Sequence, residues 1–227
     1  VVVATLEEPK FYSRVAGAWS PHDYAQAVSV QRSSIQRSSY HSADCPHVAV
    51  TPAYVVYSWV GDGSLFLKVI DRSTGAIVRN EAALYQDIGA HATVVCGDYV
   101  MVFYDDTAGT SLYARRYTPS TGDMSSATTC NTSEVYVFDA NVYSSTKCLL
   151  AQVYEDGADS ILSIVEVNAT SPPTFGDGAL VYSGVTYVHQ VGSISVAQDG
   201  TSAFVAFFTF DVTYGVWMYR FDLATFT

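Results

Sequence analysis

Residues 65–75 read LFLKVIDRSTG, and residues 112–122 read LYARRYTPSTG. Both stretches are strand-like runs that reach the same Ser-Thr-Gly, a pattern typical of a strand that ends in a tight turn. Two further copies, ILSIVEVNATS (161–171) and VWMYRFDLATF (216–226), keep the strand but lose the Gly. The copies recur about every 50 residues, which is the period of a stacked or radially repeated unit.

Each copy belongs to the same series of four elements. A short strand of small apolar residues comes first, a strongly hydrophobic strand second and the quoted strand third, with an acidic turn between the second and the third. A more variable fourth strand leads to the next copy. Four antiparallel strands in about 50 residues are the signature of a β-propeller blade. The expected first strands are 47–51, 91–96, 139–144 and 192–197, and the expected second strands are 54–60, 99–105, 148–154 and 203–210.

The sequence therefore predicts an all-β fold, with one β-propeller domain over residues 1–227. Residues 1–46 are expected to form a partial or irregular blade, within which 1–14 looks like a second strand, a turn and a third strand. Either the two chain ends pair to close the ring, or the chain is a fragment of a larger propeller. Because it opens on Val, not Met, we expect a piece of a longer protein. The four recognisable blades are 47–90, 91–138, 139–190 and 191–227.

The repeated turn has a structural explanation. Asp71 at its entrance is expected to accept hydrogen bonds from backbone N–H groups two or three residues further on. Gly75 supplies the positive φ that such a turn often needs. Thr118, Asn168 and Asp222 take the place of Asp71 in the other copies. We interpret the motif as a strand terminator on the face opposite the acidic turns.

The pattern L-x-L-x-V-I-D71-x-x-T74-G75 resembles the repeat of quinoprotein-like propellers, whose blades carry a similar D-x-x-T-G. It covers one short stretch in a good copy and in a weaker one. In that family a Trp usually follows the Gly and docks neighbouring blades, whereas this chain has Arg79 there. The resemblance implies a propeller fold and not the quinone cofactor.

Composition narrows the class of protein. The chain is 49% hydrophobic and 14% aromatic, which is ample for a core. Its formal net charge of −11 argues against nucleic acid or an anionic membrane as a partner. With no apolar run of about 18 residues, no membrane insertion is expected. The cysteines form no C-x-x-C pair, so we expect no structural zinc site, and their disulfide pairing stays open; they are Cys45, Cys96, Cys130 and Cys148. No other metal and no cofactor is expected.

One face of the propeller is expected to gather carboxylates and imidazoles. The turns between second and third strands lie on the same face as the loops that lead into first strands. Such a ring could bind a cation, the hydroxyl groups of a sugar or a basic partner. The simpler interpretation is a solvated acidic rim, with the histidines as polar caps of strands. The residues expected on this face are Asp44, His47, Asp62, Asp87, His91, Asp105, Asp106, Asp156, Asp159 and His189.

No catalytic residue is predicted. There is no G-x-S-x-G elbow and no phosphate-binding loop. The expected first strands carry no acid beyond Asp139, although glycosidases use two carboxylates. We therefore expect a non-catalytic binding or structural propeller of a virion, of phage tail type, or of an extracellular protein. Its partners would be proteins of an assembly or a surface glycan, within a larger parent chain or oligomer. The alternative is a five-bladed propeller glycoside hydrolase or lyase.

Overall fold

The computed structural model describes residues 11–15, 18–22, 46–61, 63–85, 88–106, 110–133, 135–156, 159–185, 191–209 and 215–225. All helical or extended structure in these ranges is β-strand, as predicted. Contacts divide the chain into two units, residues 1–39 and 40–227. In the first unit β1 (Phe11–Val15) and β2 (Ala18–His22) form an antiparallel hairpin. The rest of the expected partial blade before Pro46 lies outside the described residues, and its membership of one domain with the other blades stays a prediction.

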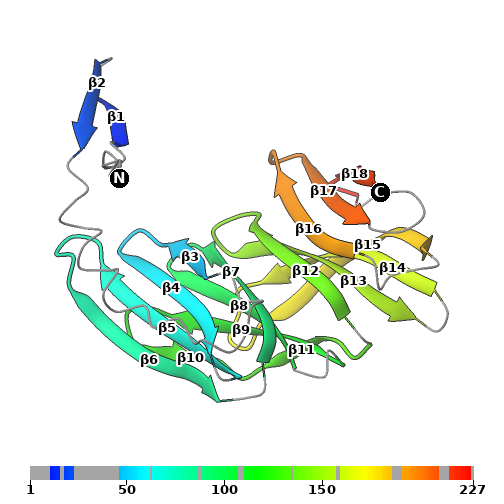
Figure 1. Ribbon diagram of the computed structural model, residues 1–227, viewed down its shortest axis with the longest axis horizontal. Helices are drawn as coiled ribbons and strands as arrows, with labels where there is room; N and C mark the ends of the chain where they lie inside the picture. Colours follow the sequence, from blue (N-terminus) through cyan, green and yellow to red (C-terminus); the bar gives the residue numbers. More distant parts are fainter. Residues whose placement is uncertain are drawn as a thin grey trace, which may run out of the picture. The chain divides into compact units, whose positions relative to one another are not determined.

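The second unit holds four antiparallel sheets whose strands pair in chain order (Figure 1). In the second sheet the last two short strands, Asp123–Met124 and Thr128–Asn131, both pair with the third strand, Leu112–Thr118, and together take the fourth position. The first sheet consists of β3 (His47–Val50), β4 (Tyr54–Gly61), β5 (Ser64–Asp71) and β6 (Ile77–Tyr85). The second consists of β7 (Ile88–Cys96), β8 (Tyr99–Asp106), β9 (Leu112–Thr118), β10 (Asp123–Met124) and β11 (Thr128–Asn131). The third consists of β12 (Val135–Val142), β13 (Lys147–Asp156), β14 (Asp159–Asn168) and β15 (Thr174–Val185), and the fourth of β16 (Val191–Gln198), β17 (Ser202–Thr209) and β18 (Gly215–Asp222).

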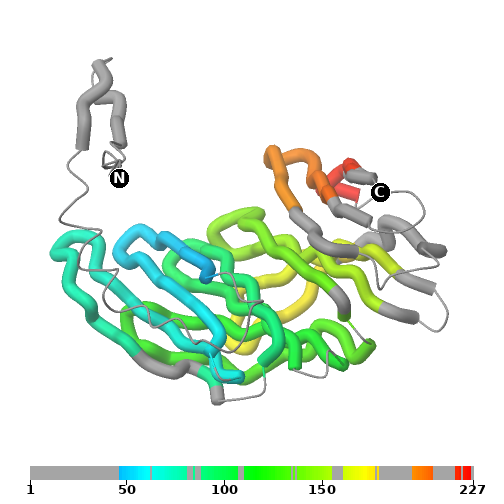
Figure 2. Tube along the Cα trace, in the orientation of Figure 1, coloured from blue at the N-terminus to red at the C-terminus, as the bar shows by residue number. Residues whose placement is uncertain are grey.

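Successive sheets of this unit meet through their first strands. β3 contacts β7, β7 contacts β12, and β12 contacts β16. Figure 2 shows the same succession by colour, from cyan in the first sheet through green and yellow to red in the fourth. Antiparallel sheets that pack face to face and meet at their first strands are propeller blades. The predicted all-β propeller fold is therefore confirmed.

Two first strands begin earlier than predicted. β7 begins at Ile88 and not at residue 91, and β12 begins at Val135 and not at residue 139. A β-bulge near the start of each strand breaks the alternation of side chains, because two residues there oppose one on the partner strand. As a result His91 and Asp139 lie inside their strands. The bulges fall between Ile88 and His91, between Val135 and Val137, and, in β16, between Val191 and Ser193.

The core lies between the sheets, and β13 shows how it is built. Leu149 and Leu150 are adjacent and both are 0% exposed. Leu149 packs in a cluster with residues of the fourth sheet, such as Val205. Leu150 packs in a cluster with residues of the second sheet, such as Phe103. Because successive side chains of a strand point to opposite faces, an inner blade needs apolar residues on both faces.

The turn after β5 has the predicted chemistry. Asp71 Oδ1 accepts hydrogen bonds from the backbone N–H groups of Ser73 and Thr74, each at 2.9 Å. It also accepts from the hydroxyl of Ser73 at 2.6 Å. These bonds, the Ser73 hydroxyl first, lower the pKa of Asp71. Gly75 has φ of 70° and donates its N–H to the carbonyl oxygen of Asp71 at 2.8 Å.

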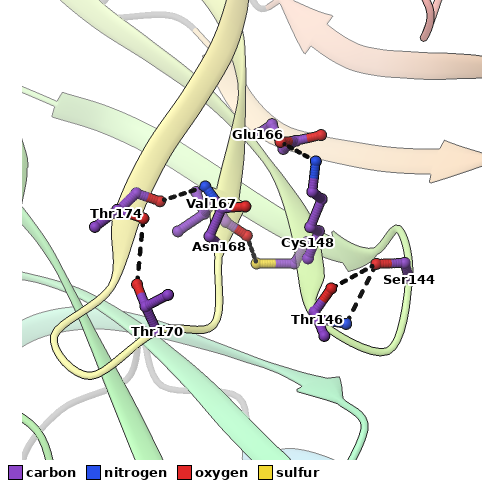
Figure 3. A network of polar contacts seen from close by, with 9 residues as sticks. Ser144, Thr146, Cys148, Glu166, Val167, Asn168, Thr170 and Thr174 are labelled. Carbon is purple, nitrogen blue, oxygen red and sulfur yellow. Dashed lines mark hydrogen bonds and ion pairs between the residues drawn. The ribbon is translucent and has the colours of Figure 1, made fainter.

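The other copies of the turn use this chemistry in part. Asp222 accepts from the N–H groups of Ala224 and Thr225 at 2.8 and 3.1 Å. Asn168 instead donates through Nδ2 to the carbonyl oxygen of Thr174 at 3.3 Å (Figure 3). Asn168 therefore links the end of β14 to the start of β15, whereas Asp71 organises the turn that follows β5.

Asp71→Ala is expected to loosen this turn while leaving the sheet intact. Ser73 and Thr74 should exchange their amide protons roughly ten-fold faster, because each loses its acceptor. Hydrogen exchange followed by NMR measures this effect. Asp71→Asn is the matched control, since it keeps a side-chain oxygen and should exchange at a rate between the two. Unchanged exchange in Asp71→Ala would show that the carboxylate does not hold the turn.

Arg79 joins the first sheet to the second, at the position where quinoprotein-like blades usually have a Trp. Its guanidinium Nη2 donates to the carbonyl oxygen of Thr121, in the Ser-Thr-Gly turn of the second sheet. A Cβ on Gly122 would lie 2.5 Å from Arg79 Cζ, so the Gly leaves room for this side chain. The next boundary repeats the arrangement, since Thr128 Oγ1 donates to the carbonyl oxygen of Pro173 at 2.8 Å. The turn after the third strand of a blade thus also accepts a hydrogen bond from a side chain of the preceding blade.

Candidate functional site

Only part of the predicted face can be placed. His47, His91, Asp105 and Asp106 have described side chains. Asp156 and Asp159 face each other across the β13–β14 hairpin, with only their backbone described. The structure brings the two histidines into contact and sets the two aspartates next to each other at the end of β8. The remaining predicted residues, Asp44, Asp62, Asp87 and His189, lie outside the described residues.

The two histidines meet where the first and second sheets pack together. His47 begins β3 and His91 follows the bulge of β7, and their ring centroids lie 4.8 Å apart with an edge-to-face angle of 67°. His91 is 6% exposed, and its Nε2 lies 3.1 Å from Ser58 Oγ on β4. Ser58 Oγ in turn lies 3.3 Å from Thr93 Oγ1. His91 is therefore a buried link between two sheets and does not cap its strand.

The surroundings keep both imidazoles neutral at neutral pH. The pKa of His91 is lowered to about 3, by burial first and by the neighbouring His47 second, while hydrogen bonding to Ser58 opposes both effects. Burial also lowers the pKa of His47, whereas the charge of Asp139 raises it. Asp139 stands on β12, so the first strands of three sheets contribute to the electrostatics of this pair.

Asp105 completes the bulge at the start of β7. Its Oδ1 accepts a hydrogen bond from the backbone N–H of Ala90, one residue before His91. A Cβ on Gly89 would lie 2.9 Å from the same oxygen, so the bulge needs a glycine beside this carboxylate. Burial raises the pKa of Asp105 to about 6. Sequence reasoning missed the role of Gly89, because an isolated glycine in a strand marks a bulge without naming its partner.

Asp106 and Asp139 are also bound to backbone groups. Asp106 accepts from the N–H and from the hydroxyl of Thr110, both at 2.8 Å, and so closes its own loop. Asp139 Oδ2 accepts from the N–H of Val196 on β16 at 3.0 Å. Asn141 donates to the carbonyl oxygen of the same Val196 at 2.9 Å. The two β12 side chains thus bind both backbone polar groups of one residue in the next sheet.

Within the described ranges no group of three or more His, Cys, Asp or Glu side chains is arranged to hold a metal ion. Cys96, Cys130 and Cys148 are free thiols, and Cys45 lies outside the description. Burial raises the pKa of Cys148, and its Sγ donates to the carbonyl oxygen of Val167 at 3.7 Å (Figure 3). In the described part of the chain there is also no helix of the length and hydrophobicity needed to cross a membrane.

No family model and no curated protein matches the chain. Among solved structures, hydrazine synthase of Kuenenia stuttgartiensis is similar at 11% identity and a TM-score of 0.46, over 73% of this chain and 65% of that one. The subtype N10 neuraminidase-like protein of A/little yellow-shouldered bat/Guatemala/060/2010 is similar at 10% identity and a TM-score of 0.47, over 79% and 61% of the two chains.

A prolyl endopeptidase is similar at 12% identity and a TM-score of 0.48, over 96% of this chain and 36% of that one. This chain thus spans less than two thirds of the length of each of the three. At these identities and TM-scores the likenesses assign no activity and no partner to it.

Proposed function

We propose that the chain is a non-catalytic binding or structural propeller that contacts glycan or protein surfaces in a virion or an extracellular assembly. The observation that carries the proposal is that three aspartate carboxylates bind the backbone of the protein itself. Asp105, Asp106 and Asp139 each accept a hydrogen bond from a backbone N–H of the fold itself. A glycosidase needs a carboxylic acid and a carboxylate directed at its substrate. Carboxylates engaged in bulges, loops and blade contacts favour a structural use.

The proposed partners follow from charge and composition. A formal net charge of −11 disfavours nucleic acid and anionic membranes. The 17 Tyr residues suit the recognition of proteins and glycans, because a phenol offers an apolar ring together with a hydroxyl. The proposal includes a larger parent chain or an oligomer. The quinoprotein-like resemblance supports only the blade turn at Asp71, and the proposal includes no cofactor.

One observation favours the alternative, a five-bladed propeller glycoside hydrolase or lyase. Burial raises the pKa of Asp105 to about 6. A carboxyl group that keeps its proton close to neutral pH suits the role of a general acid. Against this, one oxygen of Asp105 is already bound to Ala90.

The proposal is tested by binding measurements on a matched pair of charge-neutralising variants. A glycan microarray and a screen against co-purifying assembly proteins identify a partner, and calorimetry gives its Kd. Asp106→Asn changes the predicted face, whereas Asp98→Asn changes an exposed residue in the β7–β8 turn on the opposite face. We expect Asp106→Asn to weaken binding roughly ten-fold, because it removes the charge from the carboxylate that holds Thr110 in place on this face. Asp98→Asn should leave the Kd within about two-fold.

The same preparations separate the two functions. Cleavage of an oligosaccharide that disappears in Asp105→Asn would establish the enzyme and contradict the proposal. An equal loss of affinity in Asp106→Asn and Asp98→Asn would show that binding does not use the predicted face. The absence of any glycan or protein partner would contradict the proposal as a whole.

A further inference from the structure

We propose that the contact between His47 and His91 makes the packing of the first sheet on the second sheet sensitive to acid. We call this packing the first seam: it comprises the apolar cluster shared by the two sheets, including Val56, Leu67 and Val102, and the polar contacts around the two imidazoles. The inference does not depend on the proposed function, because it concerns the stability of the fold.

The geometry leaves no place for a second proton on His91. Its Nε2 is bound to Ser58, which is itself 0% exposed. Its Nδ1 is buried and has no hydrogen-bond partner among the described residues. Protonation would therefore create a buried donor and a charge that lacks a partner, and both are costly away from water.

The groups around the pair decide where acid acts first. His47 is only partly buried and interacts with Asp139 of β12, so it is the better site for a first proton. Once His47 is charged, its ring lies 4.8 Å from that of His91 and repels a second proton. The register partner of His91 on β8 is Tyr104, whose hydroxyl accepts from Arg115, a further cation. Above about pH 3, His91 therefore takes up a proton mainly when the first seam opens.

The sign of the effect follows from the direction of the pKa shift. The folded pKa of His91 is about 3, below the ordinary value of 6.5, so the open form takes up the proton first. The stability of the seam is complete above about pH 6.5 and declines as the pH falls toward about 3. In that window the opening equilibrium shifts by up to about ten-fold per pH unit for one histidine.

Asp105 on β8 contributes with the opposite sign. Its folded pKa of about 6 lies above the ordinary value of 3.8, so the folded form binds the proton more tightly. This residue therefore gains stability as the pH falls through 6 toward 4, and partly offsets the loss at His91. Asp105→Asn removes the offset and should steepen the response of the first seam to acid.

Hydrogen exchange with mass spectrometry between pH 7.5 and 4.5, corrected for intrinsic exchange, tests the inference on the whole chain. Peptides from β3, β4 and β7 should lose about three-fold in protection relative to peptides from β13 and β14 in the wild-type protein, and at least about ten-fold in Asp105→Asn, which lacks the offset. His91→Gln should abolish this difference. In the wild-type protein, NMR titration should place the pKa of His91 far below that of an exposed histidine.

A second variant keeps the test decisive if His91→Gln fails to fold. His47→Gln removes the like neighbour and leaves His91 in place, so the folded pKa of His91 should rise. The loss of protection should still begin near pH 6.5 but end at a higher pH, and so be smaller than in the wild-type protein. Protection of β3, β4 and β7 that follows the third sheet at every pH would overturn the inference. An acid response of unchanged size in a folded His91→Gln would overturn it as well.

Discussion

Leu150→Ala is expected to lower the free energy of unfolding by about 3 kcal/mol, within the range measured for leucines that leave a cavity in a rigid core. Leu150 is 0% exposed and packs in the cluster between the second and third sheets with Phe103 and Val167. Both sheets are held in place by further neighbours, so the cavity has little room to collapse. Urea denaturation followed by circular dichroism gives the free energy.

Met218→Ala is the matched control for this substitution. Met218 is 72% exposed, so its truncation removes little buried area and should change the free energy of unfolding by less than about 0.5 kcal/mol. A loss at Leu150 no larger than at Met218 would mean that the second and third sheets do not share a packed core.

Gly97→Ala is expected to cost about 2–4 kcal/mol of unfolding free energy, by two separate effects. Gly97 lies in the β7–β8 turn with φ of 62°, where a side chain strains the backbone. In addition, an added Cβ would lie 2.7 Å from the carbonyl oxygen of Ser145, in the loop between β12 and β13. Relief of this clash requires the turn of the second sheet to move away from the third. Thermal and urea unfolding of the variant measure the loss.

Gly75→Ala separates the two effects at Gly97. Gly75 has a similar φ of 70°, but an added Cβ there meets nothing within 4 Å. Only the backbone strain remains, and it should cost about 1 kcal/mol. If both variants lose the same free energy, the turn at Gly97 makes no close contact with the third sheet.

The blades were predictable because their signals are local. Asp71 and Gly75 organise one turn through bonds that span only a few residues, so the repeat of that turn reveals the repeat of the fold. The starts of β7 and β12 were misplaced because a bulge interrupts the alternation on which strand assignment rests. Sequence alternation reports one strand with its two faces. It does not report where the partner strand gains or loses a residue.

The candidate site was predictable only as a set of residues. His47 and His91 recur at the start of the predicted first strands, which suggested a common face. That the rings touch, and that Ser58 and Thr93 complete the cluster, depends on how two sheets pack. Arg79 was noticed as a departure from the resembling family. Its replacement of the Trp by a bond to Thr121 could not be inferred, because the acceptor is a backbone carbonyl that carries no mark in the sequence.

Each boundary between successive blades includes a hydrogen bond from a side chain of the earlier blade to a backbone carbonyl oxygen of the later one. Arg79 of the first sheet donates to the second, Thr128 of the second donates to the third, and Asn141 of the third donates to the fourth. Each donor and its acceptor are particular to one boundary, so a blade moved to another place in the chain would bring a donor without its carbonyl. A graft in such a chain would therefore have to carry two successive whole blades, so that each side-chain donor moves together with the carbonyl that it binds.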